Sequence, residues 1–356
     1  MSGDYLLKSR GLSIYARLPG GEIEYVINRY GGWFMEEKEL WHVRKVTAEE
    51  YESLVPNKGA FFNEPRFTEL NKNKADEVYY LILMRAESAR FGVIVGKIGT
   101  EARCPFSAPY SYPVAIIGES KQETIDAGLI AMEEYLISEG IRSIRYIFPP
   151  LFYDEHLLSG WVSAFYRNGY RVINLDISYA LNLDRLNVSE EQYGNMITAK
   201  GRKSLRRARR SGLDIVKCET EEEYREAYRI IEIGHEFKGF PVKLSFEQLA
   251  DTLKLVEHDV FIVRKDGVGI VAEFLYRINK KVVQGIYTGA HPDYTECNGM
   301  NLLTWNTIQY YGKLGYKILD KATATENSEP NYGLCNFKES VGCERSLKYT
   351  FMKKLG

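Results

Sequence analysis

The apolar positions of this chain repeat one local plan: a helical stripe, a glycine stop and then a short apolar strand. The plan occurs at 121–139, Gly140 and 142–148, at 157–168, Gly169 and 171–181, and at 299–314, Gly315 and 316–320. Such repetition is typical of a duplicated α/β unit.

Other segments predict strands that follow one another without a helix between them. Residues 259–264 and 269–278 are joined by Lys265-Asp266-Gly267, whose Asp-Gly pair favours a tight hairpin turn, and 281–288 follows as a third strand. In the first half, 78–86 and 91–99 form another pair of strands. Three meandering strands, a helix and a further strand predict a mixed α+β fold with largely antiparallel pairs.

The segment 104–113 contains three prolines and cannot be a central strand. We expect it to run as a loop across one end of a sheet, either lining a pocket or serving as a stiff connector.

A chain of 356 residues with an apolar fraction of 45% can bury two cores. The boundary is expected around 182–190, where a strand ends and a capped helix begins. The predicted domains are therefore 1–185 and 186–356.

The most polar helix is strongly basic. Residues 200–210 hold five arginines and two lysines, although the formal net charge of the chain is −1. At helical spacing Leu205 and Ala208 share one apolar stripe with Ile197, while Arg202, Arg206, Arg209 and Arg210 fan across the other side. Arginine forks match phosphate and carboxylate oxygens in pairs, so this helix is a candidate anion site. A solvated basic face is the plain alternative.

The beginning and end of this basic region carry helix signals. Ser189 and Gln192 have the spacing of a capping box, and Gly212 is a suitable stop. Gly194 and Gly201 weaken the interior, so a break into two helices near Lys200 is an open alternative.

Several classes of protein lack their usual sequence support. The five cysteines and five histidines show no metal-ligand or redox spacing, and neither a phosphate-binding P-loop nor a dinucleotide-binding glycine fingerprint occurs. No apolar run approaches the roughly 20 residues of a membrane span. The N-terminus carries Asp4, Lys8 and Arg10 without an apolar region behind them, so we expect a cytoplasmic protein with no metal.

Four short motifs, taken together in order, resemble the Fem family of non-ribosomal peptidyl transferases and their FemAB-like relatives. The motifs are 61–67, the loop 105–110, the basic segment 201–216, and Asn336-Phe337-Lys338-Glu339 with its continuation to Gly342. The resemblance spans most of the chain and implies two tandem GNAT-type acyltransferase domains. It also implies transfer of an aminoacyl group from charged tRNA to an amine on a cell-wall precursor, or of another activated acyl group in some relatives.

The resemblance carries residue roles with it. Lys338 occupies the lysine of the family's Phe-Lys motif, where a cation can stabilise an oxyanion; an ordinary strand lysine pointing to water is the alternative. Phe62, Asn63 and Tyr110 lie within the motifs and are expected to bind substrate. Arg202, Arg206 and Arg210 are assigned to the phosphates of the donor or acceptor.

The remaining candidates lie on strands of the second domain. The strand 281–288 occupies the place where a GNAT domain opens its sheet, which makes Tyr287 a candidate to bind the acyl carbonyl or protonate a leaving group. A core tyrosine is an equal alternative. Glu273 and Asp320 are the candidate bases for deprotonating the amine, unless they pair with nearby cations.

One segment departs from the pattern of enzymes that use coenzyme A. Such domains cradle pyrophosphate on glycine-rich backbone before a helix, but here the nearest match places Glu296 and Asn301 at the outer positions. An acid there repels pyrophosphate. The Fem enzymes have likewise lost this cradle, so the resemblance favours an aminoacyl-tRNA type of donor, and coenzyme A stays an alternative.

Three functional hypotheses stay open. The first is a transferase that moves an activated acyl group, linked to tRNA, onto an anionic acceptor bearing a primary amine. The second keeps the fold but uses acyl-coenzyme A and a small amine. The third is a non-catalytic RNA-binding protein that uses the basic helix, and acidic residues at 219–223 close behind that helix argue against it.

Overall fold

The structure, a computed structural model, describes residues 13–17, 23–27, 41–118 and 121–356. Asp4, Lys8 and Arg10 lie outside the described residues. Strands β1 (Ser13–Arg17) and β2 (Ile23–Ile27) pair antiparallel with each other.

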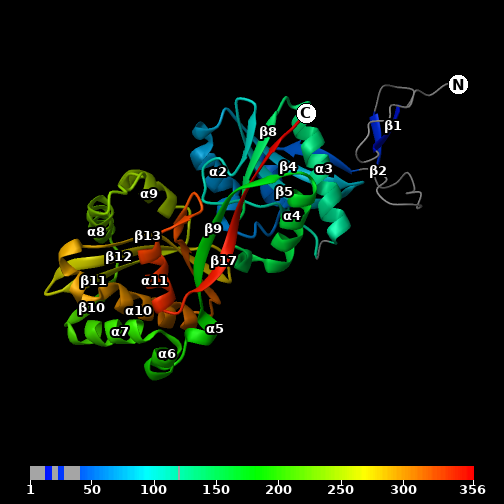
Figure 1. Ribbon diagram of the computed structural model, residues 1–356. Helices are drawn as coiled ribbons and strands as arrows, with labels where there is room; N and C mark the ends of the chain where they lie inside the picture. Colours follow the sequence, from blue (N-terminus) through cyan, green and yellow to red (C-terminus); the bar gives the residue numbers. More distant parts are fainter. Residues whose placement is uncertain (1–12, 18–22, 28–40, 119–120) are drawn as a thin grey trace.

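Most of the described strands join one mixed sheet of 13 strands (Figure 1). In spatial order they are β10 (Leu213–Lys217), β11 (His258–Lys265), β12 (Val268–Arg277), β13 (Val282–Ala290), β14 (Ile318–Thr323), β9 (Arg171–Asn182), β17 (Glu344–Lys354), β8 (Ser143–Ile147), β6 (Glu101–Cys104), β5 (Ser88–Ile98), β4 (Glu77–Arg85) and β3 (Trp41–Val46), with β7 (Val114–Ala115) paired to β5. A separate hairpin joins β15 (Thr325–Glu326) to β16 (Glu329–Pro330).

The sheet consists of two halves with the same plan. The first half is β3-β4-β5-β6-β8-β17 and the second is β10-β11-β12-β13-β14-β9. In each half only the fourth and fifth strands, β6 with β8 and β13 with β14, pair parallel. The last strands are exchanged, because β9 pairs with β14 and the C-terminal β17 pairs with β8. The expected mixed, largely antiparallel fold is confirmed, and the boundary at residue 185 stays a prediction.

Helices cover both faces of each half. In the first half, α3 (Gln122–Ser138) and α4 (Glu155–Arg167) pack on Tyr79, Leu81 and Leu83 of β4. On the other face, Tyr51 of α1 (Ala48–Leu54) packs with the alternate β4 residues, such as Ile82. The short helices of this half are η1 (Phe61–Asn63), α2 (Pro65–Asn71), η2 (Lys72–Lys74) and η3 (Leu151–Tyr153).

The second half is layered in the same way. In Figure 1, α8 (Glu221–Phe237) and α9 (Phe246–Leu253) lie on one side of β11–β13, and α7 (Ala199–Arg210) and α10 (Gly299–Lys313) lie on the other. Alternation along β11 explains this, since Val260 and Ile262 face α8 and α9, while Phe261 and Val263 face α7 and α10. The remaining helices are α5 (Leu183–Leu186), α6 (Glu190–Met196), η4 (Pro292–Cys297) and α11 (Tyr332–Ser340).

Local signals in the sequence correspond to these elements. Ser189 and Gln192 form the expected capping box at the start of α6, and the helix breaks before Thr198, which caps α7. The hairpin turn between β11 and β12 has positive φ at Asp266 (50°) and Gly267 (81°), as an Asp-Gly turn requires.

The described residues contain neither a membrane-spanning helix nor a cluster of metal ligands. No helix in these ranges is long and apolar enough to cross a membrane. Within the same ranges no group of three or more His, Cys, Asp or Glu side chains could hold a metal ion.

Candidate active site

The sheet opens in the second half between β13 and β14. The two strands pair over only three positions, which end at Gln284 opposite Asp320. Beyond this point the β13 register on β12 shifts, so that Ile286 has no partner. On β14, Lys321 and Ala322 form an irregularity against β9, and Ala322 has a φ of 61°, which is unusual for a residue with a side chain. Two bulges therefore hold the strands apart.

A cavity of about 380 Å³ lies at this opening, and we call it the smaller cavity. Its walls come from both halves of the sheet. The Pro-rich loop contributes Ser107, Ala108 and Pro109, so the pocket alternative for this loop holds. The other lining residues are Phe62, Phe67, Asn71, Lys74, Leu244, Thr252, Tyr276, Gln284, Gly285, Ile286, Tyr287 and Ala322.

A buried ion pair lies next to Gly285. The carboxylate of Glu273, which is 0% exposed, pairs with the ammonium of Lys321 and accepts a hydrogen bond of 3.1 Å from the Thr288 hydroxyl. Its second oxygen, Oε2, has no hydrogen-bond partner. A side chain at Gly285 would begin 2.7 Å from Oε1 of Glu273. The absence of a side chain there therefore makes room for the carboxylate.

Asp320 is also 0% exposed but has a different environment. Its Oδ1 accepts the N–H of Ala322 at 2.7 Å, and its Oδ2 lies 2.9 Å from the Tyr153 hydroxyl. Burial raises the pKa of Asp320, although these two hydrogen bonds oppose the rise. Tyr153 in turn contacts Tyr110 at 2.8 Å, and Tyr110 contacts Oε1 of Gln284 at 3.2 Å. The two candidate carboxylates are therefore held in different ways.

Lys338 lies on α11 and is only 5% exposed, so it is neither on a strand nor in water. Its ammonium donates to the carbonyls of Ala322 at 3.0 Å and Thr323 at 2.9 Å and lies 5.6 Å from the Tyr179 ring centroid. Burial lowers the pKa of Lys338 to about 8. Its charge is thus directed at the irregular segment of β14 whose Ala322 lines the smaller cavity.

The other expected site residues divide into two groups. Phe62 and Tyr287 line the smaller cavity, and burial raises the pKa of the half-buried Tyr287. Tyr110 is buried behind Gln284. Asn63 lines neither described cavity, because its amide binds the Lys58 carbonyl at 3.1 Å and the Ser111 hydroxyl at 3.1 Å. Asn63 therefore supports the local chain.

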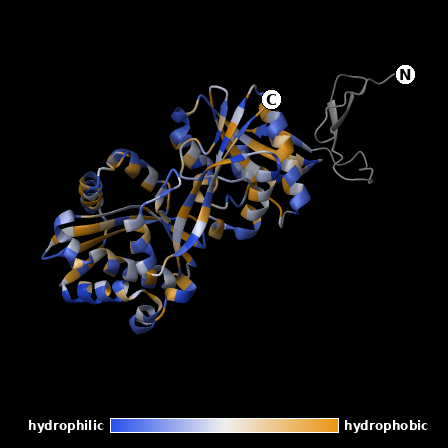
Figure 2. Cartoon of the chain, viewed as in Figure 1, coloured by the Kyte–Doolittle hydropathy of each residue, from blue (hydrophilic) through white to orange (hydrophobic). Residues whose placement is uncertain are grey.

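The basic helix α7 packs on the face of the second half that bears α10. None of its residues lines either described cavity. Arg202 Nη1 donates to the carbonyls of Gly194 at 3.0 Å and Ile197 at 2.8 Å, which end α6. Arg206 and Arg210 are exposed, and Figure 2 shows α7 as a strongly hydrophilic helix. The structure does not bring these arginines together with Lys338 at the opening.

The segment 296–301, which departs from the pattern of enzymes that use coenzyme A, lies at the start of α10. Asn298 takes a left-handed conformation (φ 56°), Glu296 is exposed beside it, and Asn301 is buried in the first turn. A side chain at Gly299 would begin 2.9 Å from Val271 Cγ2, so this glycine serves packing. An exposed acid therefore stands at this helix start.

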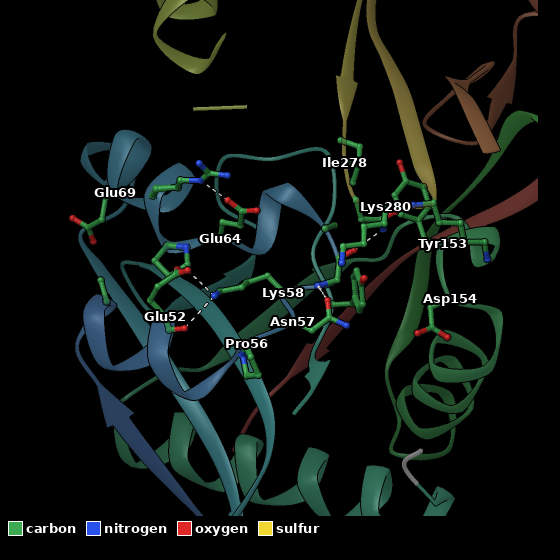
Figure 3. A pocket seen from close by; sticks show the side chains of 18 of the residues that line it. Glu52, Pro56, Asn57, Lys58, Glu64, Glu69, Tyr153, Asp154, Ile278 and Lys280 are labelled. Carbon is green, nitrogen blue, oxygen red and sulfur yellow. Dashed lines mark hydrogen bonds and ion pairs between the residues drawn. The ribbon is translucent and has the colours of Figure 1, made fainter. Parts of the chain in front are cut away.

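A larger cavity of about 1100 Å³ lies between α1, α2 and the turn after β12 (Figure 3). Lys58 pairs with Glu52 at 2.6 Å, Arg66 pairs with Glu64, and Asn279 donates to the Gly59 carbonyl at 2.7 Å. Tyr153, which reaches Asp320, lines this cavity too. The other lining residues are Ala48, Glu49, Pro56, Asn57, Ala60, Pro65, Glu69, Tyr112, Asp154, Ile278, Lys280 and Lys281.

Sequence reasoning missed Lys321, Gln284 and Tyr153. Strand alternation places Lys321 on the face opposite to Asp320, and nothing in the sequence pairs it with Glu273, 48 residues away. Gln284 lies within a predicted strand like many core residues. Only the register of β13 on β14 shows that it stands at the opening.

The comparisons with known proteins support the fold. No protein-family model matches the sequence, and no curated protein matches it at a significant level. Among solved structures, FemX is similar with a TM-score of 0.64 and 12% identity, covering 88% of this chain and 97% of FemX. A tandem GNAT protein from the clavulanic acid biosynthesis pathway is similar with a TM-score of 0.53 and 11% identity, covering 89% of this chain and 99% of that protein.

A third structure, L-PGS from Bacillus licheniformis, has a TM-score of 0.55 and 13% identity and covers 85% of this chain and 90% of that one. The chain thus has a fold similar to that of tandem GNAT proteins. The resemblance to FemX and the FemAB-like proteins that the motifs indicated holds at the level of the fold.

Proposed function

We propose that this protein is an acyl or aminoacyl transferase that moves an activated acyl group onto a primary amine. The observation that carries the proposal is the opening between β13 and β14, where a cavity lined by both halves lies against a cluster of buried ionisable groups. Perturbed and buried titratable groups beside a cavity are typical of catalytic sites.

The reaction is a direct attack of the amine on an ester or thioester carbonyl. A carbon–nitrogen bond forms, the bond to the leaving oxygen or sulfur breaks, and the amine loses a proton that the leaving group gains. No covalent enzyme intermediate is needed, so the main tasks are orientation and charge stabilisation.

Three residues take the chemical roles. Lys338 supplies positive charge behind the Ala322 peptide, where it acts on the oxyanion of the tetrahedral intermediate. Tyr287 lines the cavity and is assigned to the acyl carbonyl or the leaving group. Glu273 is assigned as the base, because its carboxylate lies beside Gly285 of the cavity wall and its Oε2 has no hydrogen-bond partner.

The donor that we favour is an aminoacyl-tRNA or a similarly activated ester, and the acceptor is an anionic amine-bearing molecule such as a cell-wall precursor. Glu296 and Asn301 at the start of α10 support this choice, because they are poorly suited to a pyrophosphate. Acyl-coenzyme A with a small amine is the alternative. Calorimetric titration with acetyl-coenzyme A separates the two, because saturable micromolar binding supports the coenzyme A alternative.

The test of the enzyme assignment is turnover in a lysine variant. Lys338→Met should lower transfer from a panel of aminoacyl-tRNAs and acyl-coenzyme A thioesters by about 10²–10³-fold, as removal of an oxyanion-stabilising group does. Mass spectrometry of the acylated amine measures the product. Lys353→Met is the matched control, because it removes a partly buried lysine that pairs with Glu133 in the first half. Equal turnover in wild type and Lys338→Met would refute the role of Lys338.

A further inference from the structure

Four polar side chains form a continuous chain of contacts from the buried interior to the smaller cavity. Asp320 Oδ2 lies 2.9 Å from the Tyr153 hydroxyl, which lies 2.8 Å from the Tyr110 hydroxyl, which lies 3.2 Å from Gln284 Oε1. Tyr110 and Tyr153 belong to the first half, and Asp320 and Gln284 are paired neighbours on β14 and β13. The chain therefore joins the halves at the point where the sheet opens.

Counting protons fixes the direction of these hydrogen bonds. An amide oxygen only accepts, so Tyr110 must donate its single proton to Gln284. The oxygen of Tyr110 is then free to accept the proton of Tyr153. The third contact, between Tyr153 and Asp320, has no phenolic proton left. All three contacts are hydrogen bonds only if the Asp320 carboxyl supplies the third proton.

The surroundings of Asp320 agree with a neutral carboxyl. Asp320 is 0% exposed, and its contacts are one peptide N–H and one phenol, with no ion pair to any described residue. A buried carboxylate without a paired cation is costly. Asp259 provides the contrast: it is equally buried but contacts Arg277 at 3.0 Å and Lys217 at 2.9 Å.

We propose that Asp320 is a carboxylic acid in the folded protein and a positioning residue that, through Tyr153 and Tyr110, turns the amide NH₂ of Gln284 toward the smaller cavity. Gln284 lines that cavity, and its Nε2 has no partner among the described residues. An NH₂ group held in this way donates to a carbonyl oxygen. The assignment of that oxygen to the acyl substrate rests on the proposed function, whereas the protonation of Asp320 does not.

The opposite arrangement has a distinct signature. If Asp320 were ionised, Tyr153 would donate to it, Tyr110 to Tyr153, and Gln284 would have to turn its NH₂ to Tyr110 and its oxygen to the cavity. The cavity would then present an acceptor suited to an amine. Burial raises the pKa of Asp320, which supports the neutral form. The titratable groups that face Asp320 are Tyr153, Tyr110, Lys338, Lys348 and Cys343, with Lys321 adjoining it on β14.

The first experiment compares the stability of two variants across pH. In Asp320→Asn the new NH₂ donates to Tyr153 and reproduces the neutral carboxyl. Above the ordinary aspartate pKa of about 3.9 only the unfolded wild type would lose this proton, so its unfolding equilibrium constant should rise by up to about tenfold per pH unit relative to Asp320→Asn. Urea unfolding at several pH values measures the difference. A constant difference, or one that favours the wild type as pH rises, would overturn the proposal.

Asp259→Asn is the matched control. It also neutralises a buried aspartate, but it leaves Arg277 and Lys217 without their carboxylate, so it should be less stable than the wild type at neutral pH. Asp320→Asn should be at least as stable as the wild type under the same conditions. If both variants were destabilised alike, Asp320 would be ionised and the proposal would be wrong.

Infrared spectroscopy tests the same assignment without unfolding the protein. At neutral pH the wild type should show the C=O stretch of a protonated, buried carboxyl group, and ¹³C-labelled aspartate should shift that band. Asp320→Asn should lack it, while Asp259→Asn should keep it. Absence of the band from the wild type would overturn the proposal even if the variants failed to fold.

Turnover addresses the part that depends on the proposed function. Tyr110→Phe removes the donor that fixes Gln284 and should lower kcat about tenfold with little change in KM, because an orienting contact is lost rather than a binding one. Tyr170→Phe controls for loss of a buried phenol and should retain kcat, because Tyr170 lines neither described cavity. A protonated Asp320 with unchanged kcat in Tyr110→Phe would refute the role of Gln284 alone, whereas an inactive wild type would refute the proposed function.

Discussion

The two halves of the sheet share a strand order but differ where their parallel strands meet. In the first half, the pairing of β6 with β8 ends on Cys104 opposite Tyr146. Both residues are fully buried, and the Tyr146 ring stacks on Phe148 at 5.1 Å. In the second half, the pairing of β13 with β14 ends on Gln284 opposite Asp320. The same position of one architecture thus holds an aromatic core in one half and polar chemistry in the other.

The first half also contributes to the opening of the second. After Cys104 the chain leaves the sheet as the Pro-rich loop, which lines the smaller cavity at Ser107–Pro109. Gly96 of β5 is covered by the Phe106 ring of the same loop, 2.5 Å from where a side chain would begin. In the second half Gly285 stands beside a carboxylate instead. The loop that follows the closed, apolar β6–β8 pairing thus forms part of the wall of the cavity at the open β13–β14 pairing.

The buried ion pair at the opening of the second half should contribute most to stability. Lys321→Met leaves the buried Glu273 without its cation and should lower the free energy of unfolding by about 3–5 kcal/mol. Urea unfolding measures this loss. The double variant Glu273→Gln with Lys321→Met should recover most of it, because both charges are then gone. A double variant no more stable than Lys321→Met would mean that packing, not charge, holds this site.

Alanine substitutions at one glycine in each half should differ in their effect on turnover. Gly285→Ala pushes on Glu273 beside the smaller cavity, and Gly96→Ala pushes on Phe106. Both should lower stability by about 1–3 kcal/mol through overpacking. Only Gly285→Ala should also lower turnover, by about 10–100-fold, because small misplacements in a site are costly. If the two variants lost equal turnover for an equal loss of stability, Gly285 would have no special role in the site.

The pH dependence of turnover tests the buried lysine. With a pKa of about 8, Lys338 loses its charge as pH rises, so kcat should fall by up to tenfold per pH unit above that value. Lys338→Arg should remove the fall, since arginine stays protonated. A rate that rises through the same range would identify Lys338 as a base instead. Stability should change in the opposite direction. The free energy of unfolding of the wild type should rise relative to that of Lys338→Met between about pH 8 and the pKa of an unfolded lysine, near 10.4.

Local sequence signals predicted most of the fold. The helix–glycine–strand units, the capping box at Ser189 and the turn at Asp266–Gly267 all depend on neighbouring residues, and these are readable along the chain. The exchange of β9 and β17 and the pairing of Glu273 with Lys321 depend on register between distant strands. Glu273, Asp320 and Tyr287 were identifiable as candidates, but the proton arrangement around Asp320 required the positions of Tyr110 and Tyr153, which come from the other half.

The basic helix α7 lies on the surface, and none of its residues lines either described cavity. Arg206→Glu with Arg210→Glu changes two exposed side chains on α7 and should alter the free energy of unfolding by less than about 0.5 kcal/mol. Binding of acetyl-coenzyme A or of a small amine should be unchanged, because these residues line neither described cavity. Affinity for tRNA, measured by fluorescence anisotropy over a salt series, should fall with a shallower salt slope if the helix contacts phosphates.

Loss of all RNA binding with full turnover on a coenzyme A thioester would separate the helix from catalysis. Loss of turnover on charged tRNA alone would place the helix in donor recognition, outside the opening that distinguishes the second half.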